Sequence, residues 1–193
     1  MKKVAMIAIL LLNFTFVAAQ SSFKERQKKY PRVRQAYADK EKVAEKSLAD
    51  NGIKASTLQP HLRTFKQEKE LQVWAKNKND EKYTLIKTYK FRSLSGALGT
   101  RRKQGDRQVP EGFYRIDRFN PYSNFYLSLG ISYPNKSDQV LGVKGKPGGD
   151  IFIHGDCATI GCIPITDDKI KELYVYCVEA KNNNTLIPVT IFR

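Results

Sequence analysis

The first strongly patterned segment of the chain follows a basic stretch near its N-terminus. Four apolar or aromatic residues recur there at helical spacing among charged side chains: Val33, Tyr37, Ala44 and Leu48. Such a stripe forms one apolar face of an amphipathic helix. Asn51 and Gly52 then supply a typical C-terminal stop. The pattern predicts a helix over 33–50 that lies on the main domain or links to it.

Beyond Leu58 the pattern changes to short runs rich in β-forming residues, separated by turn signals. Residues 62–66 and 71–77 flank the polar stretch QEKE, which predicts a hairpin. Further strands are predicted at 82–91, 111–117, 125–133, 149–155 and 185–193. Pro188 cannot donate a hydrogen bond to a sheet, so the last strand is expected at an edge or at a bulge.

One helix interrupts these strands, over residues 166–181. Thr166 is a suitable N-cap, and acidic residues follow it in the first turn. A buried stripe is marked by Ile170, Leu173 and Tyr174. The strands and this helix predict a mainly β domain over 58–193, a sandwich or barrel-like fold with the helix covering one side. Residues 20–57 are then a basic helical extension.

The first nineteen residues have the pattern of an export signal. Lys2 and Lys3 precede a short apolar core, and residues 17–19, VAA, supply the small side chains that a signal peptidase recognises. The core is too short for a membrane-spanning helix, and charged residues follow it closely. We therefore predict a signal peptide over 1–19 and an exported protein of the periplasm or cell envelope, without a stable membrane span after cleavage before Gln20.

The chain is strongly basic, with a formal net charge of +15. Much of this charge lies in residues 24–35, KERQKKYPRVRQ, which is most simply a solvated basic arm. Outside the cytoplasm the available polyanions are the cell wall and membrane head groups. Because no motif that recognises nucleic acid is present, no nucleic-acid partner is expected.

The candidate chemistry lies in residues 151–162, IFIHGDCATIGC, which hold one of the two histidines and two of the three cysteines. A zinc site would use His154, Cys157 and Cys162, but H-x2-C-x4-C is not a zinc-finger spacing and no C-x2-C partner occurs. A second alternative makes His154 a satisfied core histidine. We predict neither a metal nor a cofactor.

The cysteine count bears on the same segment. Export permits disulfides, and an odd number leaves one thiol over when two cysteines pair. Cys157 and Cys177 are the pair that would leave Cys162 as an accessible thiol. We predict that Cys162 lies at the surface of a groove, and that Cys157 and Cys177 are buried or bonded to each other.

A third interpretation makes Cys162 a nucleophile and His154 its base. A thiol needs a base to become the reactive thiolate, and His154 lies eight positions earlier, across a turn that can bring the two together. Gly155 and Gly161 would let the backbone approach a substrate closely. The N–H of Cys162 would then be accessible as a donor to an oxyanion, as acyl transfer requires.

The segment IFIHG followed by T-x-G-C resembles the active-site motif of the YkuD-type L,D-transpeptidases, which act on bacterial peptidoglycan. The resemblance is closest to the murein branch of that family. It maps the base to His154, a hydroxyl position to Thr159, the glycine to Gly161 and the nucleophile to Cys162. It also implies the β-sandwich or barrel fold of the family, with a helix after the cysteine.

A second stretch supports the resemblance. Residues 105–116, GDRQVPEGFYRI, resemble the family sequence Thr-Pro-x-Gly-x-Phe, with Pro110, Gly112 and Tyr114 in place. The likeness covers roughly residues 60–192.

The sequence departs from the family pattern at three points. The interval from the histidine to the cysteine is short, Ile160 replaces a second histidine, and Pro164 stands where an arginine commonly follows the nucleophile. That arginine usually recognises a substrate carboxylate, so the substrate-binding residues cannot be carried over. Four basic residues are candidates for its role: Arg101, Arg102, Lys144 and Lys146.

The resemblance implies that Cys162 attacks a carbonyl of a peptidoglycan stem peptide, forming a thioacyl-enzyme, while His154 moves the proton. It assigns the carbonyl of Gly155 to orient the imidazole. Transfer of the acyl group to an amine is transpeptidation. Transfer to water would make the protein a carboxypeptidase, an endopeptidase or an amidase that releases wall-attached proteins. A non-catalytic wall-binding protein is the alternative from another class.

Overall fold

The structure is a computed structural model that describes residues 21–91, 94–157 and 160–193. The predicted signal peptide lies outside the described residues. Its helices are α1 (Phe23–Lys28), α2 (Pro31–Asp50), η1 (Ala55–Thr57), α3 (Lys136–Leu141) and α4 (Asp167–Asn182). Its strands are β1 (Leu58–Phe65), β2 (Glu70–Asn77), β3 (Thr84–Lys90), β4 (Gly112–Asn120), β5 (Ser128–Ile131), β6 (Phe152–His154), β7 (Ile163–Pro164) and β8 (Pro188–Phe192).

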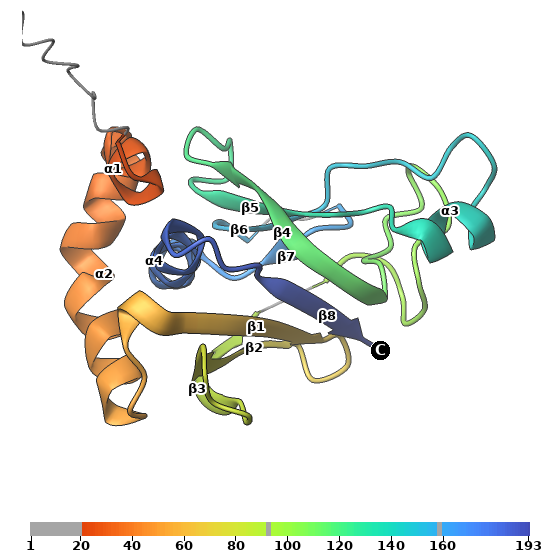
Figure 1. Ribbon diagram of the computed structural model, residues 1–193. Helices are drawn as coiled ribbons and strands as arrows, with labels where there is room; N and C mark the ends of the chain where they lie inside the picture. Colours follow the sequence, from red (N-terminus) through yellow and green to blue (C-terminus); the bar gives the residue numbers. More distant parts are fainter. Residues whose placement is uncertain (1–20, 92–93, 158–159) are drawn as a thin grey trace, which may run out of the picture.

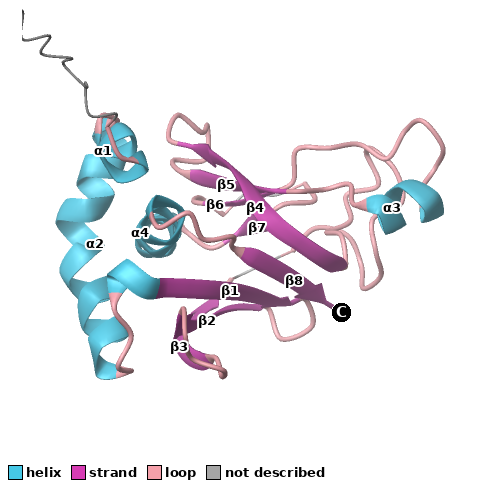
Figure 2. Cartoon of the chain, in the orientation of Figure 1, coloured by secondary structure: helices cyan, strands magenta, loops and turns pink. Residues whose placement is uncertain are grey.

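The strands form one sheet in the order β3-β2-β1-β8-β4-β5-β6-β7 (Figure 2). The pairs β1–β8 and β6–β7 are parallel, and the others are antiparallel. The prediction of a mainly β fold with a helix after the cysteine and a helical N-terminal extension is confirmed. The predicted strand at 125–133 is shortened to β5.

The expected edge position of the last strand is wrong. β8 lies in the middle of the sheet, where it pairs with β1 on one side and with β4 on the other. Pro188 is the first residue of β8 and lies opposite Arg115. A proline at the first position of a strand removes only a terminal donor, which a central strand tolerates.

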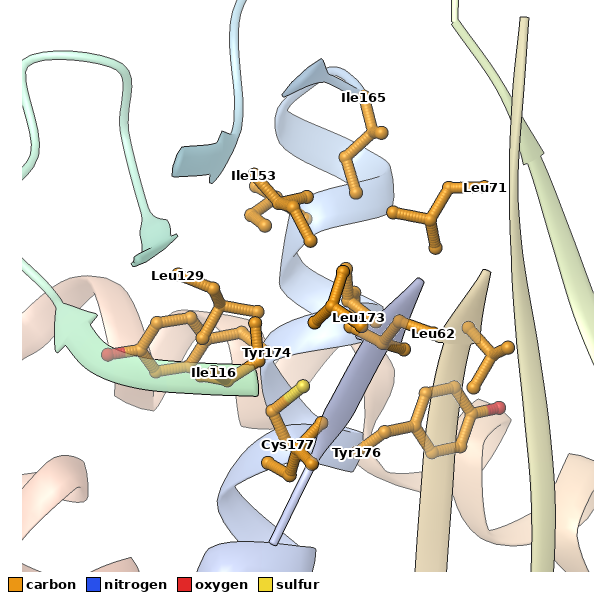
Figure 3. Packing of buried hydrophobic residues seen from close by; sticks show 14 of the residues in the cluster. Leu62, Leu71, Ile116, Leu129, Ile153, Ile165, Leu173, Tyr174, Tyr176 and Cys177 are labelled. Carbon is orange, nitrogen blue, oxygen red and sulfur yellow. The ribbon is translucent and has the colours of Figure 1, made fainter. Parts of the chain in front are cut away.

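Helix α4 fills the space between α2 and the sheet, and it carries much of the core (Figure 1). Its residues Leu173, Tyr174, Tyr176 and Cys177 are all fully or almost fully buried against strands and helix (Figure 3). A helix covered on two sides needs apolar residues on more than one face, which explains its composition. Thr166 stands at the N-cap, but its side chain makes no capping hydrogen bond.

The predicted stripe of α2 faces this core, because Val33, Tyr37, Ala44 and Leu48 are buried. Hydrogen bonding adds to the packing, since the hydroxyl of Tyr37 donates to Glu179 over 2.8 Å. The helix predicted over 33–50 is therefore confirmed, beginning two residues earlier at a proline. None of the helices in the described residues is long and apolar enough to cross a membrane.

The basic segment 24–35 is helical and docked on the domain rather than a free arm, although its side chains Arg26, Lys29, Arg32 and Arg34 are exposed as predicted. It forms α1 and the start of α2, and a capping box between Ser22 and Glu25 begins α1. Phe23 packs edge-on against Phe119, with ring centroids 5.0 Å apart. The buried Gln27 accepts a 2.8 Å hydrogen bond from the Tyr174 hydroxyl. These apolar and polar contacts hold the segment against the domain despite its positive charge.

On the side of the sheet away from α2, two long connections lie near α3 (Figure 1). They are residues 94–111 and 142–151. Two backbone hydrogen bonds hold them together, from Val143 N–H to the carbonyl of Arg102 and from Gln104 N–H to that of Lys146. The connections lead into β4 and β6, so they border the strands that carry the candidate site.

Candidate active site

His154 is the last residue of β6 and is 1% exposed. Its Nδ1–H donates to the carbonyl oxygen of Gly155 over 2.5 Å, and its ring lies 4.5 Å from that of Phe125. Because Nδ1 carries the donated proton, Nε2 of the neutral ring holds the lone pair. Nε2 has no hydrogen-bond partner among the described residues. The imidazole is thus oriented with one nitrogen available as a base.

Cys162 lies directly before β7, the strand that pairs with β6 and so with His154. The parallel pairing sets Ile153 beside Ile163 and His154 beside Pro164, so Cys162 is beside Phe152. The Phe152 N–H donates to the Cys162 Sγ at 3.4 Å. Phe152 and His154 are two residues apart and share a face of the sheet. The register therefore places the thiol and the imidazole on adjacent strands, two positions apart.

Burial shifts the pKa values of both His154 and Cys162. It lowers the pKa of His154, although the Gly155 carbonyl and the charge of Asp156 act in the opposite direction. It raises the pKa of the Cys162 thiol, and Asp150 adds to this, whereas the Phe152 N–H and the charge of Arg101 oppose it. At neutral pH the resting state is therefore a thiol near a neutral imidazole.

The two predicted glycines are constrained in different ways. A Cβ on Gly155 would lie 2.4 Å from Asp167 Oδ1 and 2.7 Å from the Phe125 carbonyl oxygen, so no side chain fits. Gly161 has a φ of +88°, which favours glycine, and a Cβ there would lie 2.7 Å from Arg101 Nη1. Thr159, the predicted hydroxyl position, lies outside the described residues.

Two residues that the sequence interpretation missed hold the loop of the site. The Gly161 N–H donates to Ser95 Oγ over 2.5 Å, and Ser95 Oγ donates to the Arg107 carbonyl over 2.8 Å. The Asp167 carboxylate accepts a 2.7 Å hydrogen bond from the Asp156 N–H. No local signal marks Ser95, and Asp167 is indistinguishable in sequence from any acidic residue in the first turn of a helix.

The structure separates the four basic candidates for carboxylate recognition. Arg101 is 6% exposed and lies against Gly161, next to Cys162. Arg102, Lys144 and Lys146 are exposed, and Arg102 reaches the Leu141 carbonyl at 3.4 Å. Arg101 is thus the member of the set that the structure brings beside the nucleophile position.

The cysteine prediction is half wrong. All three cysteines are described, and no disulfide joins any two of them. Cys177 is buried, as predicted, because it lies on the core side of α4. Cys157 is exposed, because it lies in the surface loop after β6. The sequence spacing of the two residues carries no information about this separation.

A pocket of about 370 Å³ adjoins the turn before Cys162. Its lining includes Lys66, Lys69, Leu94, Ser95 and Leu98. Ser95 belongs both to the pocket wall and to the hydrogen bond that holds Gly161. Cys162 is partly exposed and is not among the described residues that line this pocket, so a groove at the thiol itself stays a prediction.

The described residues contain no group of three or more histidine, cysteine or acidic side chains that could hold a metal ion. The alternative zinc ligands His154, Cys157 and Cys162 therefore do not converge.

Comparisons with known proteins match most of the chain to one family. The family model described as YkuD, L,D-transpeptidase catalytic domain, matches residues 60–191. The Escherichia coli K12 protein named "Putative L,D-transpeptidase YafK" is 37% identical over 122 residues, which cover 62% of this chain and 48% of that protein. The homologous protein of the O157:H7 strain matches equally.

Among solved structures, a mutant of the helical cell shape determining protein Pgp2 from Campylobacter jejuni is 25% identical with a TM-score of 0.55. The match covers 77% of this chain and 53% of that one. A second Pgp2 structure, at 23% identity and a TM-score of 0.54, shows the same fold. The chain spans about half the length of these relatives.

Proposed function

From the premise that this chain belongs to the YkuD family of L,D-transpeptidase catalytic domains, we propose that it is an exported cysteine enzyme that transfers acyl groups between peptidoglycan stem peptides. Cys162 is the nucleophile and His154 the base. The observation that carries the proposal is the hydrogen bond from His154 Nδ1 to the Gly155 carbonyl, which leaves Nε2 as the basic nitrogen one strand from Cys162.

In the first half of the reaction, Nε2 of His154 takes the thiol proton as the sulfur of Cys162 bonds to the substrate carbonyl carbon. The carbonyl electron pair moves to oxygen, and the resulting oxyanion is stabilised by the N–H of Cys162. When the tetrahedral intermediate collapses, the C–N bond breaks and His154 gives its proton to the leaving amine. The product is a thioacyl-enzyme.

In the second half, an acceptor amine attacks the thioester carbonyl and loses a proton to His154. The C–S bond then breaks, and the thiol of Cys162 is restored by that proton. With water as the acceptor the same steps give hydrolysis, either of stem peptides or of the link to wall-attached proteins. Gly155 serves by orienting the imidazole and Gly161 by allowing the backbone conformation before the nucleophile, and Thr159 is the hydroxyl position of the family motif.

The low pKa of His154 suits this cycle, because the imidazole stays neutral and able to accept a proton at neutral pH. The raised pKa of Cys162 means that the thiolate forms as the substrate binds and the proton moves, rather than as a resting ion pair.

We also assign the domains and the location of the protein. Residues 1–19 are a cleaved signal peptide, residues 20–57 a basic helical extension and residues 58–193 the catalytic domain. Its substrates then lie in the periplasm or cell envelope, and its basic surface favours the acidic polymers found there over nucleic acid.

The test is acylation by a carbapenem, whose strained lactam offers an activated carbonyl. The mature protein should gain the mass of one ligand, as measured by intact-mass spectrometry. Cys162→Ser should lose the adduct, since a serine hydroxyl has a much higher pKa than a thiol. Cys157→Ser is the matched control, because Cys157 is the more exposed thiol five positions away.

Retention of the adduct by Cys162→Ser, or its loss from Cys157→Ser alone, would contradict the assignment. Stem tetrapeptides and cross-linked muropeptides then separate the two acceptors. New cross-links identify a transferase, whereas shortened peptides alone identify a hydrolase. A protein that processes neither, with or without Cys162, would be a binding protein.

A further inference from the structure

Arg101 is a buried cation held between two glycines. Its side chain is 6% exposed. A Cβ on Gly148 would lie 2.7 Å from Nη2, and one on Gly161 would lie 2.7 Å from Nη1. Both glycines have positive φ values, +78° and +88°. The backbone on each side of the guanidinium therefore carries no side chain. This leaves room for the charge directly against Gly161, the residue that precedes Cys162.

The guanidinium is weakly compensated for so buried a group. Nη1 reaches the Gln108 carbonyl at 3.4 Å and Asp106 Oδ1 at 3.7 Å, and the charge lies 5.6 Å from the centre of the Tyr133 ring. Nε has no hydrogen-bond partner among the described residues. Burying a charge is costly unless it is closely paired. Asp106 balances this charge only across 3.7 Å, so the guanidinium stays a source of positive potential for other groups close to it.

Cys162 is one of the groups on which this charge acts. The charge of Arg101 favours the thiolate of Cys162, and Asp150 is the acidic group that opposes it. Asp150 is itself paired with Arg118, whose Nη1 lies 2.5 Å from its Oδ1. His154, on the adjacent strand, is neutral at rest because burial lowers its pKa. The fixed cation on the thiol side is therefore Arg101.

We propose that Arg101 is a positioning residue for Cys162: its guanidinium, wedged between Gly148 and Gly161, supplies a fixed positive charge that stabilises the thiolate and holds the turn that presents it. The inference rests on the proposed role of Cys162 as the nucleophile. It deepens that role by assigning part of the thiolate's stabilisation to a residue distant in sequence from the motif.

The test is the pH dependence of Cys162 alkylation by iodoacetamide, followed by intact mass in the full chain carrying Cys157→Ser. That substitution removes the exposed thiol, and Cys177 is buried and reports unfolding if it reacts. Arg101→Met removes the charge at similar volume, Arg101→Lys keeps it, and Arg102→Met is the control on an exposed neighbour.

A cation close to a thiolate shifts its titration by about one unit or more, so Arg101→Met should slow alkylation at neutral pH about tenfold and move the midpoint upward. Arg101→Lys should stay near the parent profile, and Arg102→Met should match it. Carbapenem acylation should slow in parallel with alkylation.

An unchanged profile in a folded Arg101→Met variant would overturn the proposal. If that variant exposes Cys177, Arg101→Lys decides: a parent-like profile supports the role of charge, and a tenfold loss overturns it. Neither result bears on the nucleophile itself, since failure of the proposed function would appear as an unmodified parent protein in the carbapenem experiment.

Discussion

Two regions of the molecule each hold a cysteine, and the contrast between them shows what makes a thiol usable. In α4, Cys177 is fully buried among aliphatic and aromatic side chains, and desolvation alone raises its pKa. Directly before β7, burial also raises the pKa of Cys162, but the Phe152 N–H and the Arg101 charge act against it. The two thiols therefore differ in their partners: groups that favour the anion surround Cys162, whereas burial is the influence that acts on Cys177.

The two regions also differ in the length and regularity of their secondary structure. Helix α4 spans 16 residues, whereas β6 has 3 and β7 has 2. Three described non-glycine residues with positive φ flank these short strands: Asp150, Asp156 and Thr166. Such conformations are unfavourable for residues with a Cβ and persist where the surroundings impose them. Stability is thus concentrated in the helical layer, which supports a strained site.

The largest expected effect tests the site. His154→Ala removes the base, so carbapenem acylation should slow by roughly 10²- to 10⁴-fold, the usual contribution of a positioned general base. Intact mass against time measures the rate. His61→Ala is the matched control, because His61 lies on β1 and contacts Thr190 Oγ1 at 2.9 Å. Equal rates for the two variants would mean that His154 does not act as the base, and the site would then not differ from the rest of the molecule in reactivity.

The next effect tests the scaffold. Leu173 of α4 is fully buried, so Leu173→Ala should lower the free energy of unfolding by about 2–5 kcal/mol through lost burial and a cavity. Urea denaturation measures it. If the helical layer and the site respond independently, the acylation rate of the folded fraction should stay within about twofold of the parent. A large loss of rate in folded protein would show that the two regions are coupled.

Cys177→Ser sharpens the comparison of the thiols. It places a hydroxyl in an apolar core, so the free energy of unfolding should fall by about 1–3 kcal/mol, while acylation of Cys162 continues. Cys157→Ser, at an exposed position, should change stability by less than about 0.5 kcal/mol. Thermal melts of both variants give the comparison. Equal destabilisation would mean that Cys157 contributes packing that its exposure does not indicate.

The smallest effect is on pH dependence. Because burial lowers the pKa of His154 below its ordinary 6.5, the unfolded chain takes up a proton at pH values where the folded protein does not. The contribution of the neutral imidazole to the free energy of unfolding is therefore lost as the pH falls from 6.5 towards the pKa of His154 in the folded protein. The loss is at most about 1.4 kcal/mol per pH unit. Urea midpoints across this range should fall less steeply in His154→Gln. Identical slopes would place the imidazole in an ordinary, solvated environment.

Sequence periodicity was sufficient for elements whose burial is local. The stripe from Val33 to Leu48 predicted α2, and the β-rich runs predicted most strands within a few residues. It failed for β7, whose 2 residues are too short to show a pattern, and for α1, whose charge obscured the capping box of Ser22 and Glu25. The central position of β8 depends on pairings across the whole chain.

The residues of the candidate site also divide into those that the sequence predicts and those that it does not. The motif predicts His154 and Cys162, the family resemblance adds the orienting Gly155 carbonyl, and the structure contains the hydrogen bond from His154 to Gly155. Ser95 and Arg101 contact the loop of the site from a connection some 60 residues earlier. Such contacts leave no local trace, because they arise from the path of a loop rather than from periodicity.

The position of β8 also has a consequence for the order of events during synthesis and folding. In the described sheet, β1–β3 and β4–β7 are joined through β8, which pairs parallel to β1 and antiparallel to β4. Until residues 188–192 have emerged, the two halves of the sheet have no common strand. Long-range strand pairing of this kind slows folding. The eight strands can therefore join into one sheet only after the last segment of the chain has become available for pairing.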